Sequence, residues 1–122
     1  MSKLPLLTAD QDAEFDRLVL VWQARLNLQD WRIERGAGRA KGAMARVTTD
    51  YPARLATYQT GFWSGPTTSV AIEATVVHEL MHVALRELTY LTSAEVAAAV
   101  LESAEHRVIN TLEKLLVRAN GA

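Results

Sequence analysis

Residues 76–85 read VVHELMHVAL, a short apolar stretch that contains two histidines and a glutamate. His78 and His82 are four residues apart, which places them one turn apart on the same face of a helix. Two imidazoles with this spacing can reach one Zn²⁺ at roughly 2.0–2.1 Å each. Glu79 projects in a different direction and can hold a water molecule and accept its proton. The pattern H-E-x-x-H therefore predicts a helix with a metal site and a general base.

The residues around this pattern are apolar, so we expect most of the helix to be buried: Ile72, Val76, Val77, Leu80, Met81, Val83, Ala84 and Leu85. Burying two imidazoles and a carboxylate without partners costs on the order of several kcal/mol, and a bound cation removes that cost. The alternative is that both histidines are ordinary surface residues or core residues satisfied by hydrogen bonds.

A tetrahedral catalytic zinc needs a third protein ligand, which in a chain without Cys is His, Glu or Asp. The last predicted helix offers Glu102, Glu105 and His106. Its apolar arc consists of Val100, Leu101, Ala104, Val108, Leu112, Leu115 and Leu116. At ~100° per residue, Glu105 projects within this arc, Glu102 lies beyond its edge and His106 points farther toward solvent. Glu105 is therefore the expected third ligand, and Glu102 and His106 remain alternatives.

The remaining sequence predicts one α+β domain spanning residues 1–122. Periodicity, capping residues and turn residues predict a helix over 9–27, strands over 31–35, 43–49 and 54–62, a helix over 69–90 and a long helix from 92 to 118. A run of strands followed by a run of helices is typical of the α+β class. The short connections between strands indicate a three-stranded, mostly antiparallel sheet.

Composition limits the function. The chain has 122 residues, of which 49% are hydrophobic and 22% charged, as in a soluble globular protein. The absence of Cys excludes thiol catalysis, iron–sulfur clusters, Cys-based zinc fingers and disulfides. No apolar run approaches the ~20 residues that cross a bilayer, and the N-terminus does not resemble a secretory signal. We therefore expect a cytoplasmic protein with no membrane partner.

Charge is distributed unevenly along the chain. Residues 31–54 contain six basic side chains and two acidic ones, whereas residues 71–113 contain seven glutamates. The simplest interpretation is that strand arginines cover an exposed sheet face and pair with helix glutamates. A nucleic-acid surface is the alternative, and it is disfavoured because there is no basic run and little aromatic interleaving.

The His78–His82 pattern, followed by a helical glutamate, resembles the gluzincin pattern of zinc metallopeptidases. The order of elements resembles the minimal gluzincins and the short metallopeptidase-like proteins of phages and prophages. The resemblance implies a small Zn²⁺-dependent metallopeptidase with His78, His82 and Glu105 as ligands and Glu79 as general base. It also implies that an edge strand borders the cleft and holds an extended polypeptide substrate, and the strand over 54–62 is the candidate.

Two other functions remain open from the sequence. One is a metal-binding regulatory or interaction protein of the zincin fold with little or no proteolytic activity. The other is a nucleic-acid partner in which the metal is only structural. Candidate oxyanion donors are Tyr51, Tyr58, Tyr90 and Arg86, each of which is more simply explained by packing. Trp22 and Trp31 are expected in the core, and Trp63 either packs locally or lines the cleft.

Overall fold

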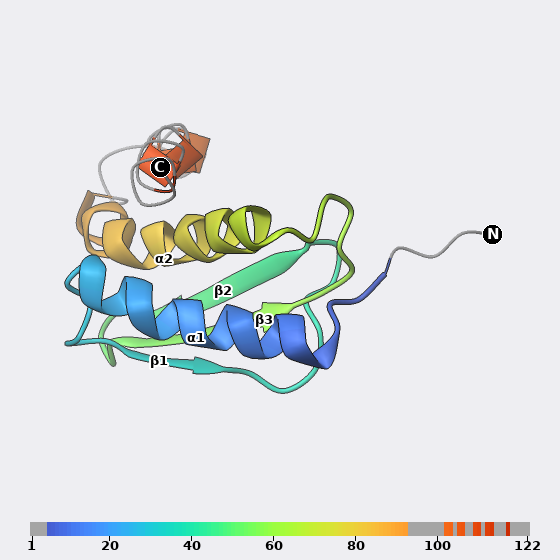
Figure 1. Cartoon of the computed structure of the whole chain (residues 1–122). Helices are drawn as coiled ribbons and strands as arrows, with labels where there is room; N and C mark the ends of the chain where they lie inside the picture. The colour runs from blue at the N-terminus through green and yellow to red at the C-terminus, as the bar shows by residue number, and fades with distance from the viewer. Residues whose placement is uncertain are drawn as a thin grey trace.

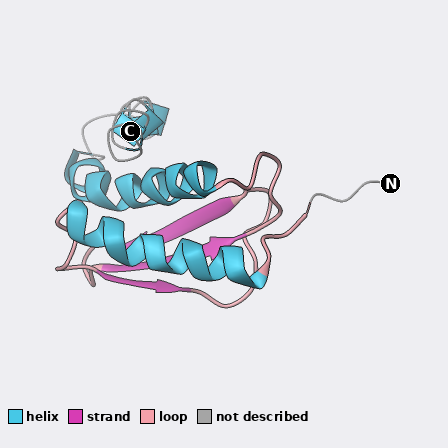
Figure 2. Cartoon of the chain, in the orientation of Figure 1, coloured by secondary structure: helices cyan, strands magenta, loops and turns pink. Residues whose placement is uncertain are grey.

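The computed structural model describes residues 5–92, with side chains to residue 86, and residues 102–103, 105–106, 109–110, 112–113 and 117. The elements in order are α1 (Ala9–Arg25), β1 (Arg32–Arg35), β2 (Ala45–Asp50), β3 (Leu55–Thr60) and α2 (Ser69–Thr92) (Figure 1). The described residues beyond 101 are helical and lie above one end of α2 (Figure 2). The predicted α+β class is confirmed. The predicted end of the last helix, at residue 118, lies outside the described residues.

Helix α1 begins with the capping arrangement that the sequence predicts. The backbone N–H of Gln11 donates to Thr8 Oγ1 at 3.2 Å, and the N–H of Thr8 donates to Gln11 Oε1 at 2.9 Å. The helix ends at Arg25, two residues before the predicted end, and Asn27 then adopts a positive φ of 57°. The left-handed conformation of Asn27 turns the chain toward β1.

The sheet is mixed, with strand order β1-β3-β2. Strand β2 pairs antiparallel with β3, from Ala45 opposite Thr60 to Asp50 opposite Leu55, whereas β1 pairs parallel with β3. The expected antiparallel pairing thus holds for one of the two pairs. The loop after β1 leads to β2, which lies at the other edge of the sheet. Strand β3 then pairs between β1 and β2. The prediction that the strand over 54–62 forms the edge is wrong, because β3 is central and β2 is the edge strand that contacts α2.

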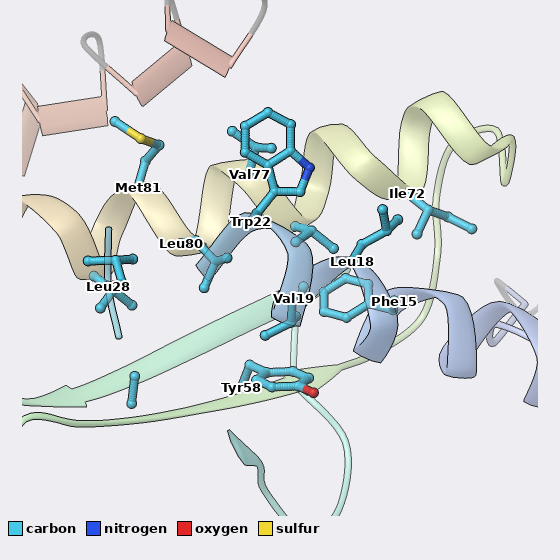
Figure 3. Packing of buried hydrophobic residues seen from close by; sticks show 14 of the residues in the cluster. Phe15, Leu18, Val19, Trp22, Leu28, Tyr58, Ile72, Val77, Leu80 and Met81 are labelled. Atoms are coloured by element: carbon cyan, nitrogen blue, oxygen red, sulfur yellow. The ribbon is translucent and has the colours of Figure 1, made fainter. Parts of the chain in front are cut away.

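The core lies between the two helices and one face of the sheet. Side chains of α1, including Phe15 and Trp22, pack against Val77 and Leu80 of α2, with Tyr58 of β3 below them (Figure 3). The predicted core positions of Trp22 and Trp31 are confirmed, at 3% and 6% exposed. No helix in the described part of the chain is long and apolar enough to cross a membrane.

Ion pairs with aspartates join α1 to the sheet. Arg35 donates to Asp16 Oδ1 at 2.9 Å and to Thr60 Oγ1 at 3.0 Å, and Tyr58 donates its hydroxyl to the same Asp16 oxygen at 2.7 Å. Burial, together with the Asp16 carboxylate, raises the pKa of Tyr58 well above its usual value. Asp12 pairs with both Arg35 and Arg39. The strand arginine Arg35 therefore pairs with aspartates of α1.

We predict that Gly61→Ala destabilises the fold at the end of β3. A Cβ at this position would clash with the backbone carbonyls of Ala40 and Ala43, and the Gly61 N–H already donates to the Met44 carbonyl at 2.8 Å. We expect the free energy of unfolding in urea to fall by about 1–3 kcal/mol. Gly65→Ala is the matched control, because a Cβ there meets open space and changes stability by less than about 0.5 kcal/mol. Equal effects of the two substitutions would contradict this interpretation.

Candidate metal centre

Helix α2 carries the H-E-x-x-H pattern between the core and the last helical segment. It begins after Thr68, whose Oγ1 accepts the N–H of Ala71 at 3.2 Å, close to the predicted start. Val76 and Val77 are fully buried on its inner side. His78 and His82 lie on another side, with 26% and 21% of their side chains exposed. The apolar face thus fixes the rotation of α2 and directs both imidazoles toward the last helical segment.

Three imidazoles meet between α2 and that segment. His78, His82 and His106 each offer a ring nitrogen, and these atoms lie within 4.8 Å of one another. The ring centroids of His106 are 4.6 Å from His82 and 5.8 Å from His78, and those of His78 and His82 are 5.1 Å apart. Among the described residues, this is the group of three that could hold a metal ion. Side chains separated by 28 residues in sequence are therefore brought to one point.

Two carboxylates of the last segment hold the imidazoles of α2. His82 Nδ1 lies 2.9 Å from Glu105 Oε1, and His78 Nδ1 lies 2.9 Å from Glu113 Oε2. A carboxylate oxygen accepts a hydrogen bond, so this contact favours the proton on Nδ1 and leaves Nε2 free to coordinate. Metal-binding histidines commonly have such a partner on the other ring nitrogen. Burial also lowers the pKa of His82, which favours the neutral imidazole that a metal requires.

The structure places Glu105 in the site, where its carboxylate contacts His82, one of the candidate metal ligands. Its carboxylate is 13% exposed and hydrogen-bonds to His82, while the third member of the imidazole group is His106. The role of Glu105 as a metal ligand itself remains a prediction. Glu102 is 72% exposed, and its Oε1 lies 3.8 Å from His106 Nε2. Of the three residues weighed for the third ligand, His106 is the one that joins His78 and His82.

Glu79 follows His78 on α2, and its carboxyl lies near Val47 and Arg46 of the edge strand and near Glu113. Burial raises the pKa of the Glu79 carboxyl to about 7, and the nearby Glu113 charge acts in the same direction. The backbone N–H of Val47 donates to the carboxyl, and this hydrogen bond and the charge of Arg46 both oppose the increase. A carboxylate with this pKa can exchange a proton near neutral pH, which is the property a general base needs.

The hydrogen-bond pattern of the sheet shows why Val47 can reach Glu79. The carbonyls of Tyr58 and Thr60 accept from Gly36 and Ala40, on the β1 side of β3. Tyr58 therefore does not bond to Val47, its partner in β2, and the backbone groups of Val47 face the outer edge. The same alternation directs the backbone groups of Ala45 and Thr49 outward. Among the described residues, the edge of β2 next to α2 thus has no strand partner on either side of Val47.

The other residues weighed for the site have structural contacts or lie outside the described side chains. Tyr58 donates to Asp16, and the ring of Tyr51 packs against Trp31 at 6.3 Å between centroids. Trp63 is 1% exposed and donates its Nε1 to the Pro66 carbonyl at 2.7 Å, so it packs locally and does not line a cleft. Arg86 is half-buried. The side chain of Tyr90 is outside the described residues.

Sequence reasoning did not single out Glu113 and placed His106 toward solvent. The signal that could have found them is the spacing of His106, Ile109, Glu113 and Val117, which are three, four and four residues apart and share a helix face. Ile109 and Val117 are 0% and 6% exposed, so this face is the buried one. The predicted apolar arc omitted both residues, and its phase therefore favoured Glu105 over His106.

Comparison of the chain with protein-family models, with characterised proteins and with solved structures finds no match. The case for a function therefore comes from the arrangement of the three imidazoles, the two carboxylates that hold them and Glu79.

We predict that Glu79→Gln stabilises the metal-free chain at pH 8. Because the pKa of Glu79 is raised, the folded chain binds more protons than the unfolded chain between about pH 4.5 and 7, so this residue makes folding less favourable as pH rises through that window. Glutamine has no charge to bury and still accepts the Val47 N–H. We expect a gain of about 1–3 kcal/mol at pH 8 in chelator-treated protein, shrinking toward zero near pH 4.5. A difference between the two proteins that does not change with pH would contradict this assignment.

We also predict that substituting a metal ligand reduces zinc binding more than substituting a residue that orients a ligand. His106→Ala should lose stoichiometric zinc, whereas Glu105→Gln and Glu113→Gln should keep one zinc per chain with affinity reduced about 10- to 100-fold. Competition with a coloured chelator measures both quantities, and the exposed Glu102→Gln serves as the unchanged control. If Glu105→Gln abolished zinc binding and His106→Ala preserved it, Glu105 would be the ligand.

Proposed function

We propose that the chain is a small zinc-dependent metallopeptidase in which His78, His82 and His106 bind the metal and Glu79 is the general base. The observation that carries the proposal is that three imidazoles converge beside a half-buried carboxyl, that of Glu79, whose pKa is raised to about 7 and which is hydrogen-bonded to the backbone of the edge strand. A purely structural zinc needs no such base and usually closes all four positions with protein groups. In this proposal, His106 takes the ligand role expected of Glu105.

The donor set fits zinc. Imidazole suits Zn²⁺ and several other transition metals, and the two carboxylates on Nδ1 increase the basicity of the ligating nitrogens. With three protein ligands, a tetrahedral ion keeps one position open. When bound, the cation supplies a Lewis acid that polarises a carbonyl and lowers the pKa of water to about 7.

Glu79 has two features suited to proton transfer. Its raised pKa allows the carboxylate to accept a proton from water and later to release it to the leaving amine. The Val47 N–H also donates to this carboxyl. The edge strand therefore holds the base in place through a backbone atom, which most substitutions at position 47 preserve.

The substrate class follows from the open edge of β2. An extended segment can add to a strand edge by main-chain hydrogen bonds, and the outward groups of Ala45 and Thr49 flank the position occupied by Glu79. Such pairing selects extended or locally unfolded polypeptides. A nucleic-acid partner has less support, because Arg32, Arg35, Arg39 and Arg54 all pair with carboxylates.

The proposal is tested by comparing the zinc-loaded wild type with zinc-loaded Glu79→Gln on an unfolded protein substrate. We expect cleavage by the wild type, its loss on chelation with recovery when zinc returns, and a rate about 10²- to 10⁴-fold lower for the variant. The variant should still bind one zinc per chain, which shows that the loss is chemical. Stoichiometric zinc without cleavage by either protein would favour the regulatory metal-binding alternative.

A further inference from the structure

Arg46 differs from the other arginines of the sheet region. Arg32, Arg35, Arg39 and Arg54 each lie within ion-pair distance of a carboxylate. In the part of the chain that the structure describes, Arg46 has no such partner. Its Nη2 donates to the Lys41 carbonyl at 3.0 Å, and both residues are exposed. A guanidinium without an acidic partner is therefore anchored near one end of the edge strand.

The position of Arg46 relates it to the proposed site. It directly precedes Val47, whose N–H donates to Glu79, and its charge acts on the Glu79 carboxylate. Its side chain lies on the open face of the sheet, because Val47 and its partner Tyr58 face the helices. A strand added to β2 would place a side chain opposite Arg46 on this open face, at about 4.5–5.5 Å between Cβ atoms.

Neither neighbour of Arg46 on that face of the edge strand carries a positive charge. Thr48 is uncharged, and the Asp50 carboxylate accepts the N–H of Ala53 at 3.3 Å in the turn after β2. A partner strand would therefore meet a positive charge at Arg46 and a negative charge four residues further along, at Asp50 where the strand ends. Opposite charges on directly opposed strand residues attract, and like charges repel.

We propose that Arg46 is a specificity-determining residue that selects extended polypeptides with a carboxylate side chain opposite it, close to the bond to be cleaved. The inference rests on the proposed function for its meaning in catalysis, but it makes a separate statement about binding. It assigns to the chain a preference for acidic segments. A free C-terminal carboxylate offers the same chemistry, and the test below distinguishes the two sources.

The experiment measures peptide binding by zinc-loaded Glu79→Gln, in which cleavage does not interfere. Three labelled decapeptides of alanine, valine and threonine are compared by fluorescence anisotropy. One has a central glutamate and an amidated C-terminus, one has glutamine in its place, and one has the glutamine and a free C-terminal carboxylate. Arg46→Gln and Arg46→Glu are added to this background, with Arg32→Gln as the control from the opposite edge strand.

We expect the glutamate peptide to bind about three- to fivefold more tightly than its glutamine counterpart. Arg46→Gln should remove this preference, Arg46→Glu should reverse it and Arg32→Gln should leave it unchanged. Equal affinities for the three peptides, or a preference that survives Arg46→Gln, would overturn the inference. Tighter binding of the free C-terminal carboxylate alone would also overturn it and assign Arg46 to chain-end recognition. If the preference holds while no wild-type cleavage occurs, the inference on binding stands and the proposed peptidase function fails.

Discussion

Two carboxylate–imidazole hydrogen bonds join α2 to the last helical segment, and the candidate metal centre depends on them. Glu105 holds His82 and Glu113 holds His78, each at 2.9 Å, and the same segment brings His106 beside both rings. Both carboxylates belong to the last helical segment, and both of their imidazole partners belong to α2. A cation bound there would therefore stabilise the packing of the last segment on α2, because a ligand that binds only the folded state adds to its stability.

The edge strand contributes to the site through its backbone. Order β1-β3-β2 makes β2 the strand next to α2, and the alternation of hydrogen bonds directs Val47 toward Glu79. Because β3 lies between β1 and β2, one side of β2 has no strand partner among the described residues. In the proposed peptidase, the strand that would align a substrate would therefore also hold Glu79 in place.

Sequence reasoning predicted the elements well where a local pattern determined them. The capping residues Thr8 and Gln11, the apolar face of α1 and the start of α2 are all local features, and they were found. Strand order was not found, because alternation along a strand says which face is buried but not which neighbour it pairs with. The helical phase that favours Glu105 as third ligand omits Ile109 and Val117, both of which are buried. Successive residues are ~100° apart around a helix, so an arc without these two residues places His106 too far toward solvent, although it correctly places Glu105 on the buried side.

The sequence by itself determined the α+β class, the helix that carries His78, Glu79 and His82, and their common helical face, because each depends on spacing within one segment. Tertiary structure decided that His106 completes the imidazole group, that Glu105 and Glu113 hold the rings and that Val47 anchors Glu79. These relations join segments that are far apart in the chain. Their geometry is set by how helices and sheet pack on a shared core, and no local pattern contains that information.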